Sequence, residues 1–209
     1  MIKLKNVSKK FSKQYVLKNI DYTFKPGEIY GLYGINGSGK TMLLRALSGL
    51  IIPSEGTIEY NDLVLHKDIS FSPNTGLIIE NMQLLPQYNA FDNLKILAKI
   101  NKRATEEDII DAINRVGLDP TSTKRVKKFS LGMRQRLNIA QAIFEKPDYL
   151  FLDEPTNALD EDGVSFIYEI LRKEADRGAT IVMASHNKED IHELCTKVIH
   201  MKEGAMVNE

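Results

Sequence analysis

The chain has 209 residues, a length that suits one domain, and with 43% hydrophobic residues it can bury a sizeable core. Its 28 basic and 28 acidic side chains balance, so the charge gives no argument for a nucleic-acid partner or an anionic membrane surface. The single cysteine, Cys195, excludes an intramolecular disulfide framework and indicates a reducing cytoplasm. The N-terminus lacks the apolar core of a signal peptide, and no apolar run approaches the roughly 20 residues that span a bilayer. Any membrane crossing would therefore be made by another chain.

The first 60 residues predict short strands. Ile2 and Leu4 alternate with polar residues, residues 16–24 have strand character, and residues 57–60 alternate again. We expect these segments to form an antiparallel sheet beside an α/β core. Residues 28–33 are mostly apolar and predict a buried strand of that core.

A phosphate-binding loop follows this strand. Residues 34–41, Gly-Ile-Asn-Gly-Ser-Gly-Lys-Thr, fit the phosphate-loop pattern, and residues 40–50 have helical periodicity. Glycines let backbone N–H groups approach a phosphate chain, and the helix dipole adds to the attraction. Lys40 is placed to reach the β- and γ-phosphates and Thr41 to ligate Mg²⁺. The predicted nucleoside triphosphate site comprises Gly34, Asn36, Gly37, Ser38, Gly39, Lys40, Thr41 and Met42.

The middle of the chain is predominantly helical. A buried strand over 76–80 ends on Glu80, and a loop leads to predicted helices over 91–100, 106–116 and 131–144. Thr105 opens the second of these helices as a capping box, and Ser130 precedes the third. We therefore expect a core made of residues 1–85 and 148–209, with a helical subdomain, residues 86–147, inserted between its strands.

Polar side chains follow two further buried strands. Residues 149–153 form an apolar strand that ends in Asp153 and is followed by Glu154, and residues 180–184 are followed by Ser185 and His186. Buried strands that alternate with helices predict a parallel sheet with helices on both faces, and ligands bind beyond the carboxyl ends of such strands. Asp153 can hold the hydration shell of Mg²⁺, and Glu154 faces the position of an attacking water. The alternative for these two acids is a helix cap or a solvated loop.

In this order, the motifs resemble those of the ATP-binding subunit of an ABC transporter, over essentially the whole chain. Residues 34–41 match Walker A, and residues 149–154 match Walker B with its catalytic glutamate. Residues 157–160, which end in Asp160, resemble the D-loop, and His186 takes the switch-histidine position. Residues 129–133, Phe-Ser-Leu-Gly-Met, resemble the family signature that normally reads Leu-Ser-Gly-Gly-Gln. This signature separates the family from other phosphate-loop ATPases.

The signature keeps Ser130 and Gly132 but has Leu131 in place of a glycine and Met133 in place of the glutamine. The resemblance implies that Ser130 and Gly132 contact the γ-phosphate of ATP bound by a partner chain, in a head-to-tail dimer. The alternative is an ordinary serine-capped helix. This signature sequence is similar to that of the bacitracin and lantibiotic exporters.

Two further roles depend on the resemblance. Glu80 lies where the family usually has the glutamine of the Q-loop and resembles the E-loop of lantibiotic-immunity exporters, with Gln83 and Gln87 as alternatives. Phe11 resembles the aromatic residue that stacks on adenine; Tyr15 is the alternative, and a structural core aromatic is a third possibility.

The resemblance implies a P-loop NTPase (RecA-like) α/β fold: a parallel-sheet core with an antiparallel β subdomain and an inserted helical subdomain. It implies ATP and Mg²⁺ as cofactors, with catalytic roles for Lys40, Glu80, Glu154 and His186, and Thr41, Asp153 and Glu80 as metal ligands. Its expected partners are a transmembrane permease subunit and a second ATPase subunit, identical or different, and not nucleic acid. The expected location is cytoplasmic, peripheral on the inner face of the cell membrane. The alternative is a soluble ABC-type ATPase acting on the ribosome or DNA, although such relatives usually carry two cassettes or a long coiled coil.

Overall fold

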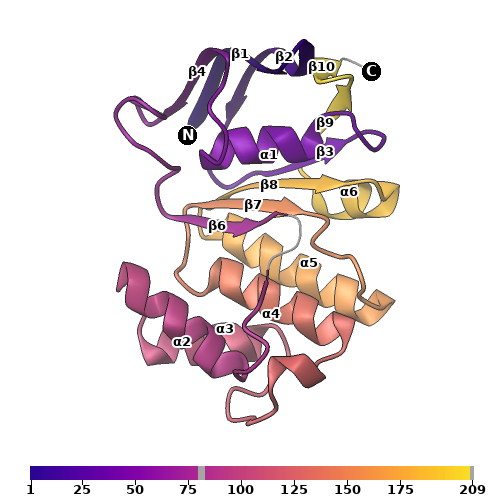
Figure 1. The fold of residues 1–209 in the computed structure, drawn as a ribbon. Coiled ribbons are helices and arrows are strands. Elements are labelled where there is room, and N and C mark those ends of the chain that lie inside the picture. The colour runs from indigo at the N-terminus through magenta and orange to yellow at the C-terminus, as the bar shows by residue number, and fades with distance from the viewer. Residues whose placement is uncertain (80–82, 208–209) are drawn as a thin grey trace.

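Two sheets organise the molecule, which the computed structural model describes over residues 1–79 and 83–207 (Figure 1). The smaller sheet is antiparallel, as expected, and lies at the top of Figure 1. Its strands, in spatial order, are β2 (Gln14–Phe24), β1 (Ile2–Phe11), β4 (Glu55–Tyr60) and β5 (Leu63–Val64).

The larger sheet forms the core, and all its neighbouring strands run parallel except β9 and β10. This confirms the predicted parallel core. The strands, in spatial order, are β10 (Ala205–Val207), β9 (Lys197–Lys202), β3 (Ile29–Tyr33), β8 (Thr180–Ser185), β7 (Tyr149–Asp153) and β6 (Thr75–Ile78).

Alternate side chains of the core strands enter two different hydrophobic cores. In β7, Tyr149 and Phe151 pack with the smaller sheet and helix α1 (Lys40–Ser48), whereas Leu150 and Leu152 pack with helices on the opposite face. This alternation is the period-two pattern of a strand, and it explains why β7 is apolar at every position up to Asp153.

Helix α1 lies between the two sheets (Figure 1). Leu43, Leu44 and Leu47 are fully buried there. The helix ends at Gly49, whose φ of 86° is left-handed, so Leu50 falls outside the helix and is exposed. The predicted helical face therefore ends one turn earlier than the sequence periodicity suggested.

The remaining helices cover the other face of the core sheet and the region below it (Figure 1). Thr105 and Asp108 form the expected capping box at the start of α3. No helix in the described ranges is long and apolar enough to span a bilayer. The elements are α2 (Ala90–Asn101), α3 (Glu106–Arg115), the 3-10 turn η1 (Val126–Lys128), α4 (Leu131–Ile143), α5 (Glu161–Asp176) and α6 (Lys188–Leu194).

The helical region meets the core sheet at a glycine. A Cβ atom added to Gly76 in β6 would lie 1.9 Å from the backbone oxygen of Ala142 in α4. Because the obstructing atom belongs to the backbone, rotation of a side chain cannot relieve the overlap. The strand and the helix can approach this closely only with glycine at position 76.

We expect the substitution Gly76→Ala to lower the free energy of unfolding by about 3 kcal/mol, the upper end of the usual cost of overpacking. Chemical denaturation measures the change. Gly178→Ala is the control: its φ of 103° is strained but a Cβ there meets open space, so it should cost only about 1 kcal/mol. A smaller loss for Gly76→Ala than for the control would contradict the close approach of β6 and α4.

Candidate nucleotide-binding site

The phosphate loop joins the end of β3 to the start of α1 and is held by its own lysine. The Nζ atom of Lys40 donates hydrogen bonds to the backbone oxygens of Gly34, at 2.6 Å, and Ile35, at 3.2 Å. Lys40 is only 7% exposed, so its charge is held inside the loop. The Oγ atom of Ser38 is buried and has no hydrogen-bond partner within residues 1–79 and 83–207. A buried polar atom of this kind fits a loop that closes around a polar ligand.

The turn between β9 and β10 supports the phosphate loop. The amide of Gly204 donates to the backbone oxygen of Ser38 at 2.9 Å, and the oxygen of Gly204 accepts from the amide of Lys18 in β2 at 2.8 Å. A Cβ on Gly204 would lie 2.6 Å from the backbone oxygen of Val16, and one on Gly39 would lie 2.9 Å from the same atom. Three distant segments therefore meet here through glycines. The sequence predicted the hairpin but gave no signal of this contact.

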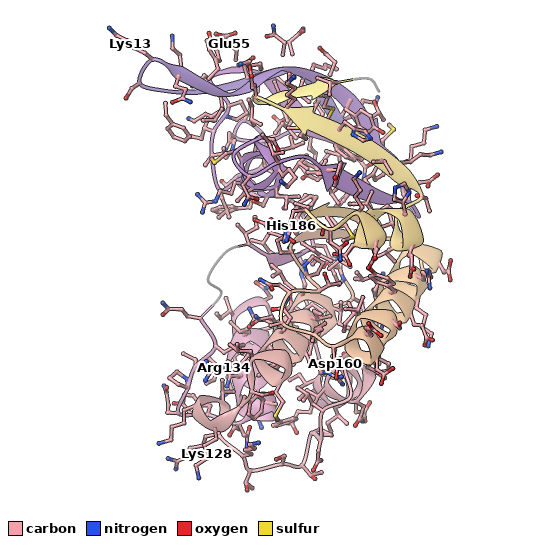
Figure 2. The ribbon with its side chains drawn as sticks, turned by 90° about the vertical axis from the view of Figure 1, so that its right-hand side faces the viewer. Lys13, Glu55, Lys128, Arg134, Asp160 and His186 are labelled. Carbon is pink, nitrogen blue, oxygen red and sulfur yellow. The ribbon has the colours of Figure 1, made fainter. Side chains whose placement is uncertain are left out.

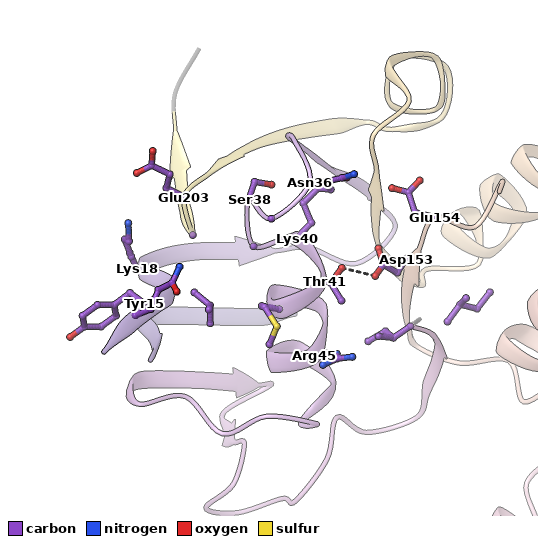
Figure 3. A pocket seen from close by; sticks show the side chains of 18 of the residues that line it. Tyr15, Lys18, Asn36, Ser38, Lys40, Thr41, Arg45, Asp153, Glu154 and Glu203 are labelled. Atoms are coloured by element: carbon purple, nitrogen blue, oxygen red, sulfur yellow. Dashed lines mark hydrogen bonds between the residues drawn. The ribbon is translucent and has the colours of Figure 1, made fainter. Parts of the chain in front are cut away.

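Two of the three expected metal ligands, Thr41 and Asp153, lie together. The Oγ1 atom of Thr41, at the start of α1, donates a hydrogen bond of 2.7 Å to Oδ2 of Asp153, at the end of β7 (Figure 3). Hydroxyl and carboxylate oxygens are the ligands that Mg²⁺ prefers. The described residues contain no group of three or more His, Cys, Asp or Glu side chains that could hold a metal. The arrangement therefore fits an ion that takes its remaining ligands from phosphate and water.

The next residue, Glu154, contacts the predicted histidine. Its Oε1 atom lies 2.8 Å from Nδ1 of His186 and accepts from the His186 amide at 3.1 Å. The amide of Glu154 donates to the oxygen of Ala184 in β8 at 2.9 Å, and its φ is 50°, a left-handed value that is uncommon outside glycine. Uncommon backbone angles at a strand end are frequent in functional sites. The structure thus brings together the two residues that the sequence placed on separate strand ends.

A cleft of about 1090 Å³ is lined by the phosphate loop, Asp153 and Glu154, whereas His186 is not among its lining residues. Figure 3 shows residues that line it, which come from the phosphate loop, α1, β2, the end of β7 and the β9–β10 turn. Gln135 and Asn138 of α4 also line it. The remaining lining residues are Lys13, Gln14, Tyr15, Val16, Lys18, Asn36, Gly37, Ser38, Gly39, Lys40, Thr41, Met42, Arg45, Ile78, Ile79, Asp153, Glu154, Asn157, Glu203 and Gly204.

The structure favours the alternative aromatic residue, Tyr15, over Phe11. Tyr15 lines the cleft, and Phe11 does not. Phe11 lies at the end of β1 under the ammonium of Lys9, 4.8 Å from the ring centroid. Tyr15 follows the turn, and its hydroxyl donates to Glu55 at 3.2 Å. Both residues flank one hairpin turn, so spacing in the sequence could not distinguish them.

The signature residues lie at a second cleft. Ser130, Gly132 and Asp160 line a second cleft of about 720 Å³, which shares no residue with the first. Ser130 caps α4 by accepting from the amide of Met133 at 3.1 Å, and Asp160 caps α5 by accepting from the amide of Gly163 at 3.0 Å. In Figure 2, Asp160 and Arg134 lie at the helical end of the molecule, below His186.

Glu80 lies outside the described residues. Strand β6 ends at Ile78, and Ile78 and Ile79 line the first cleft, so the described chain ends at the cleft just before this position. The two alternatives, Gln83 and Gln87, are exposed and are not among the residues that line either cleft.

Residues 17–157 match the family model described as ABC transporter. The chain belongs to this family. An uncharacterized ABC transporter ATP-binding protein of Bacillus subtilis (strain 168), YybJ, is 63% identical to it over 99% of this chain and 94% of the relative. The lantibiotic transport ATP-binding protein SrtF of Streptococcus pyogenes is 34% identical, over 100% of this chain and 90% of the relative.

The fold agrees with that of a solved ABC cassette. A structure described as the dimeric structure of MJ0796, a bacterial ABC transporter cassette, superimposes with a TM-score of 0.89 and 24% identity, over 100% of this chain and 97% of the other. The predicted P-loop NTPase fold and the resemblance to the family are confirmed. The ABC protein described here is therefore an ATP-binding and ATP-hydrolysing subunit.

We expect Gly204→Ala to weaken ATP binding about tenfold, since strain of about 1–3 kcal/mol at this turn would displace the phosphate loop that it holds. Titration with a fluorescent ATP analogue measures the dissociation constant. Gly178→Ala, at another left-handed glycine remote from the cleft, should leave the affinity unchanged. Wild-type affinity in a folded Gly204→Ala protein would show that the hairpin does not organise the loop.

Proposed function

We propose that this ABC subunit powers export of a peptide, an antibiotic or another amphiphile through a separate membrane subunit, by closing on a second ATPase subunit around two ATP molecules. The observation that carries the proposal is that one chain presents two separate half-sites. The phosphate loop, Asp153 and Glu154 line one cleft, and Ser130 and Gly132 line another. Each cleft alone lacks the groups of the other, so a head-to-tail pair of subunits would complete both.

The first half-site holds the triphosphate and its metal. The loop amides and Lys40 bind the phosphates, and Thr41 and Asp153 hold Mg²⁺ through the oxygens that now share a hydrogen bond. When bound, the metal neutralises charge on the phosphate oxygens. Glu80 stays in the proposal as a further ligand of metal or water, on the basis of its place in the chain.

Glu154 acts on the attacking water as the general base. Its side chain is 27% exposed, so it is partly shielded but reaches the cleft, and two hydrogen bonds from His186 fix its direction. The His186 side chain is 66% exposed, which leaves it able to contact the γ-phosphate as well. Because the reaction needs little covalent chemistry from the protein, its rate depends on positioning and on fixed charges.

The second half-site closes from the partner. Ser130 stands at the start of α4, where backbone N–H groups and the helix dipole attract an anion. Asp160 anchors the start of α5 beside it. Closure would then move the helical region of each subunit relative to the membrane subunit.

Export is supported by the similarity to a lantibiotic transport protein and by the signature sequence, which contains Leu131 and Met133. We place the subunit on the inner face of the cell membrane, bound to a permease. The second ATPase subunit is an identical or a related chain. A non-transport ATPase acting on the ribosome or DNA is not favoured, because the relatives described above are transporter proteins.

The substitution Glu154→Gln should lower ATP turnover by at least a factor of about 100, since it removes the base while keeping its shape. ATP binding should persist, and the protein should form a dimer that requires ATP. Phosphate release measures turnover, and size-exclusion chromatography with light scattering measures the dimer.

A matched variant tests the partner's contribution. Ser130→Arg in the Glu154→Gln background should prevent the ATP-dependent dimer without loss of ATP binding, because Ser130 is exposed and lies outside the first cleft. Undiminished hydrolysis in Glu154→Gln would reject the base, and a normal dimer in the double variant would reject the sandwich.

Tyr15→Ala should raise the dissociation constant for ATP about tenfold, since stacking on a base contributes about 1–3 kcal/mol. Phe11→Ala is the matched control, because it removes an exposed ring from the same hairpin outside the cleft. Titration with ATP and with inorganic triphosphate separates base stacking from phosphate binding. Equal losses for ATP in the two variants would contradict the assignment of Tyr15.

A further inference from the structure

A buried carboxylate contacts the segments that carry Glu154 and His186. Asp190, in the first turn of α6, is only 2% exposed. It accepts three hydrogen bonds from hydroxyl groups: from Thr156 at 2.7 Å, from Tyr168 at 2.5 Å and from Ser185 at 2.8 Å. A buried carboxylate is costly unless its oxygens are satisfied, so the three hydroxyls and the acid constrain one another.

The three donors come from segments that must be aligned for hydrolysis. Thr156 lies two residues after Glu154, in the turn that the amide of Asn157 closes by donating to the oxygen of Glu154 at 3.2 Å. Ser185 immediately precedes His186. One carboxylate therefore fixes both the turn that carries the base and the strand end that carries the histidine.

The hydroxyl of Ser185 shows how this affects the base. Its Oγ atom lies 2.8 Å from Oδ2 of Asp190 and 3.5 Å from Oε2 of Glu154, and it accepts from the amide of Asn187 at 3.0 Å. A hydroxyl has one proton to donate, and the shorter contact to Asp190 takes it. Asp190 thus keeps the Ser185 proton away from Glu154, so that His186 remains the hydrogen-bond donor to the Glu154 carboxylate.

The third donor, Tyr168, belongs to α5 and touches neither catalytic residue. Burial, and next the hydrogen bond to Asp190, raise the pKa of the Tyr168 hydroxyl well above its ordinary value, so it remains a donor at neutral pH. Its bond ties α5 to α6. A purely structural role of Asp190 would depend on this contact, whereas a role in catalysis would depend on Thr156 and Ser185.

We propose that Asp190 is a positioning residue for ATP hydrolysis, which holds the carboxylate of Glu154 in register with His186 through Thr156 and Ser185. The inference rests on the roles proposed above for Glu154 and His186. An amide at position 190 offers one oxygen and an N–H₂ group to three hydroxyl donors. Thr156 and Ser185 share the Oδ2 atom, whereas Tyr168 donates to Oδ1. An amide oxygen left at Oδ2 accepts more weakly than a carboxylate, so the Ser185 proton becomes free to compete for Glu154.

The test compares steady-state ATP hydrolysis by four full-length variants with that of the wild type. Asp190→Asn should lower kcat about 10- to 100-fold while the KM for ATP stays within about threefold, because the phosphate-binding groups are untouched. Thr156→Val and Ser185→Ala should each reproduce part of this loss of kcat. Tyr168→Phe should leave kcat within about threefold of the wild type, even where thermal unfolding shows a less stable protein.

Glu189→Gln provides the matched control. It removes one negative charge from the same first turn of α6. Glu189 is exposed, and within residues 1–79 and 83–207 its carboxylate makes no hydrogen bond to any of the three hydroxyls. Its kcat and KM should equal those of the wild type, which excludes an effect of helix charge alone.

Two results would overturn the proposal. One is a loss of kcat in Tyr168→Phe as large as that in Asp190→Asn. The other is wild-type kcat in both Thr156→Val and Ser185→Ala, which remain informative if Asp190→Asn fails to fold. A failure of the underlying assignment looks different: Glu154→Gln would then hydrolyse ATP as fast as the wild type.

Discussion

The parallel register of β3, β8 and β7 is the constraint on which the functional contacts depend. Tyr33 pairs with Ser185, and Asp153 pairs with Ala184, so the three strands end at the same edge of the sheet. The phosphate loop, Glu154 and His186 each follow directly after one of these ends. Since parallel strands require crossover connections, residues more than a hundred positions apart in the chain reach one edge without any long-range pairing of loops. A shift of one residue in either pairing would turn these side chains to the opposite face.

Hydrogen bonds within the chain fix the groups at this edge. The carbonyls of its loop hold Lys40, and Thr41 is bonded to Asp153. Likewise, Glu154 is fixed by His186. Donors and charges that are placed in advance need no reorganisation when charge develops on a phosphate, and this preorganisation is the main source of catalysis in such sites. Lys40 can be largely buried because its three ammonium protons have partners in the loop and in the expected phosphates.

Local patterns predicted the parts of the site that follow directly from a strand end. The phosphate loop, Asp153, Glu154 and His186 each depend on a few contiguous residues, and the structure brings them together. Contacts between distant segments could not be predicted in this way. Gly204, in the last hairpin, donates a hydrogen bond to the phosphate loop. Asp190 accepts hydrogen bonds from hydroxyl groups of three separate segments. The sequence carries no signal for such long-range contacts, because a glycine in a turn and an acid in a short helix each have many ordinary structural roles.

The turn that carries Glu154, the proposed base, is also contacted from the helical part of the molecule. From α4, the Nε2 atom of Gln135 donates to the backbone oxygen of Pro155 at 2.7 Å and lies 3.4 Å from that of Glu154. On the other side, β8 holds the amide of Glu154 through Ala184. Because Ser130 caps the start of α4, the helix that would present the proposed second half-site also contacts the turn that carries Glu154. Any rotation of α4 relative to the core sheet must therefore stretch or tighten contacts at Glu154, so the geometry of hydrolysis and the position of the helical region cannot vary independently.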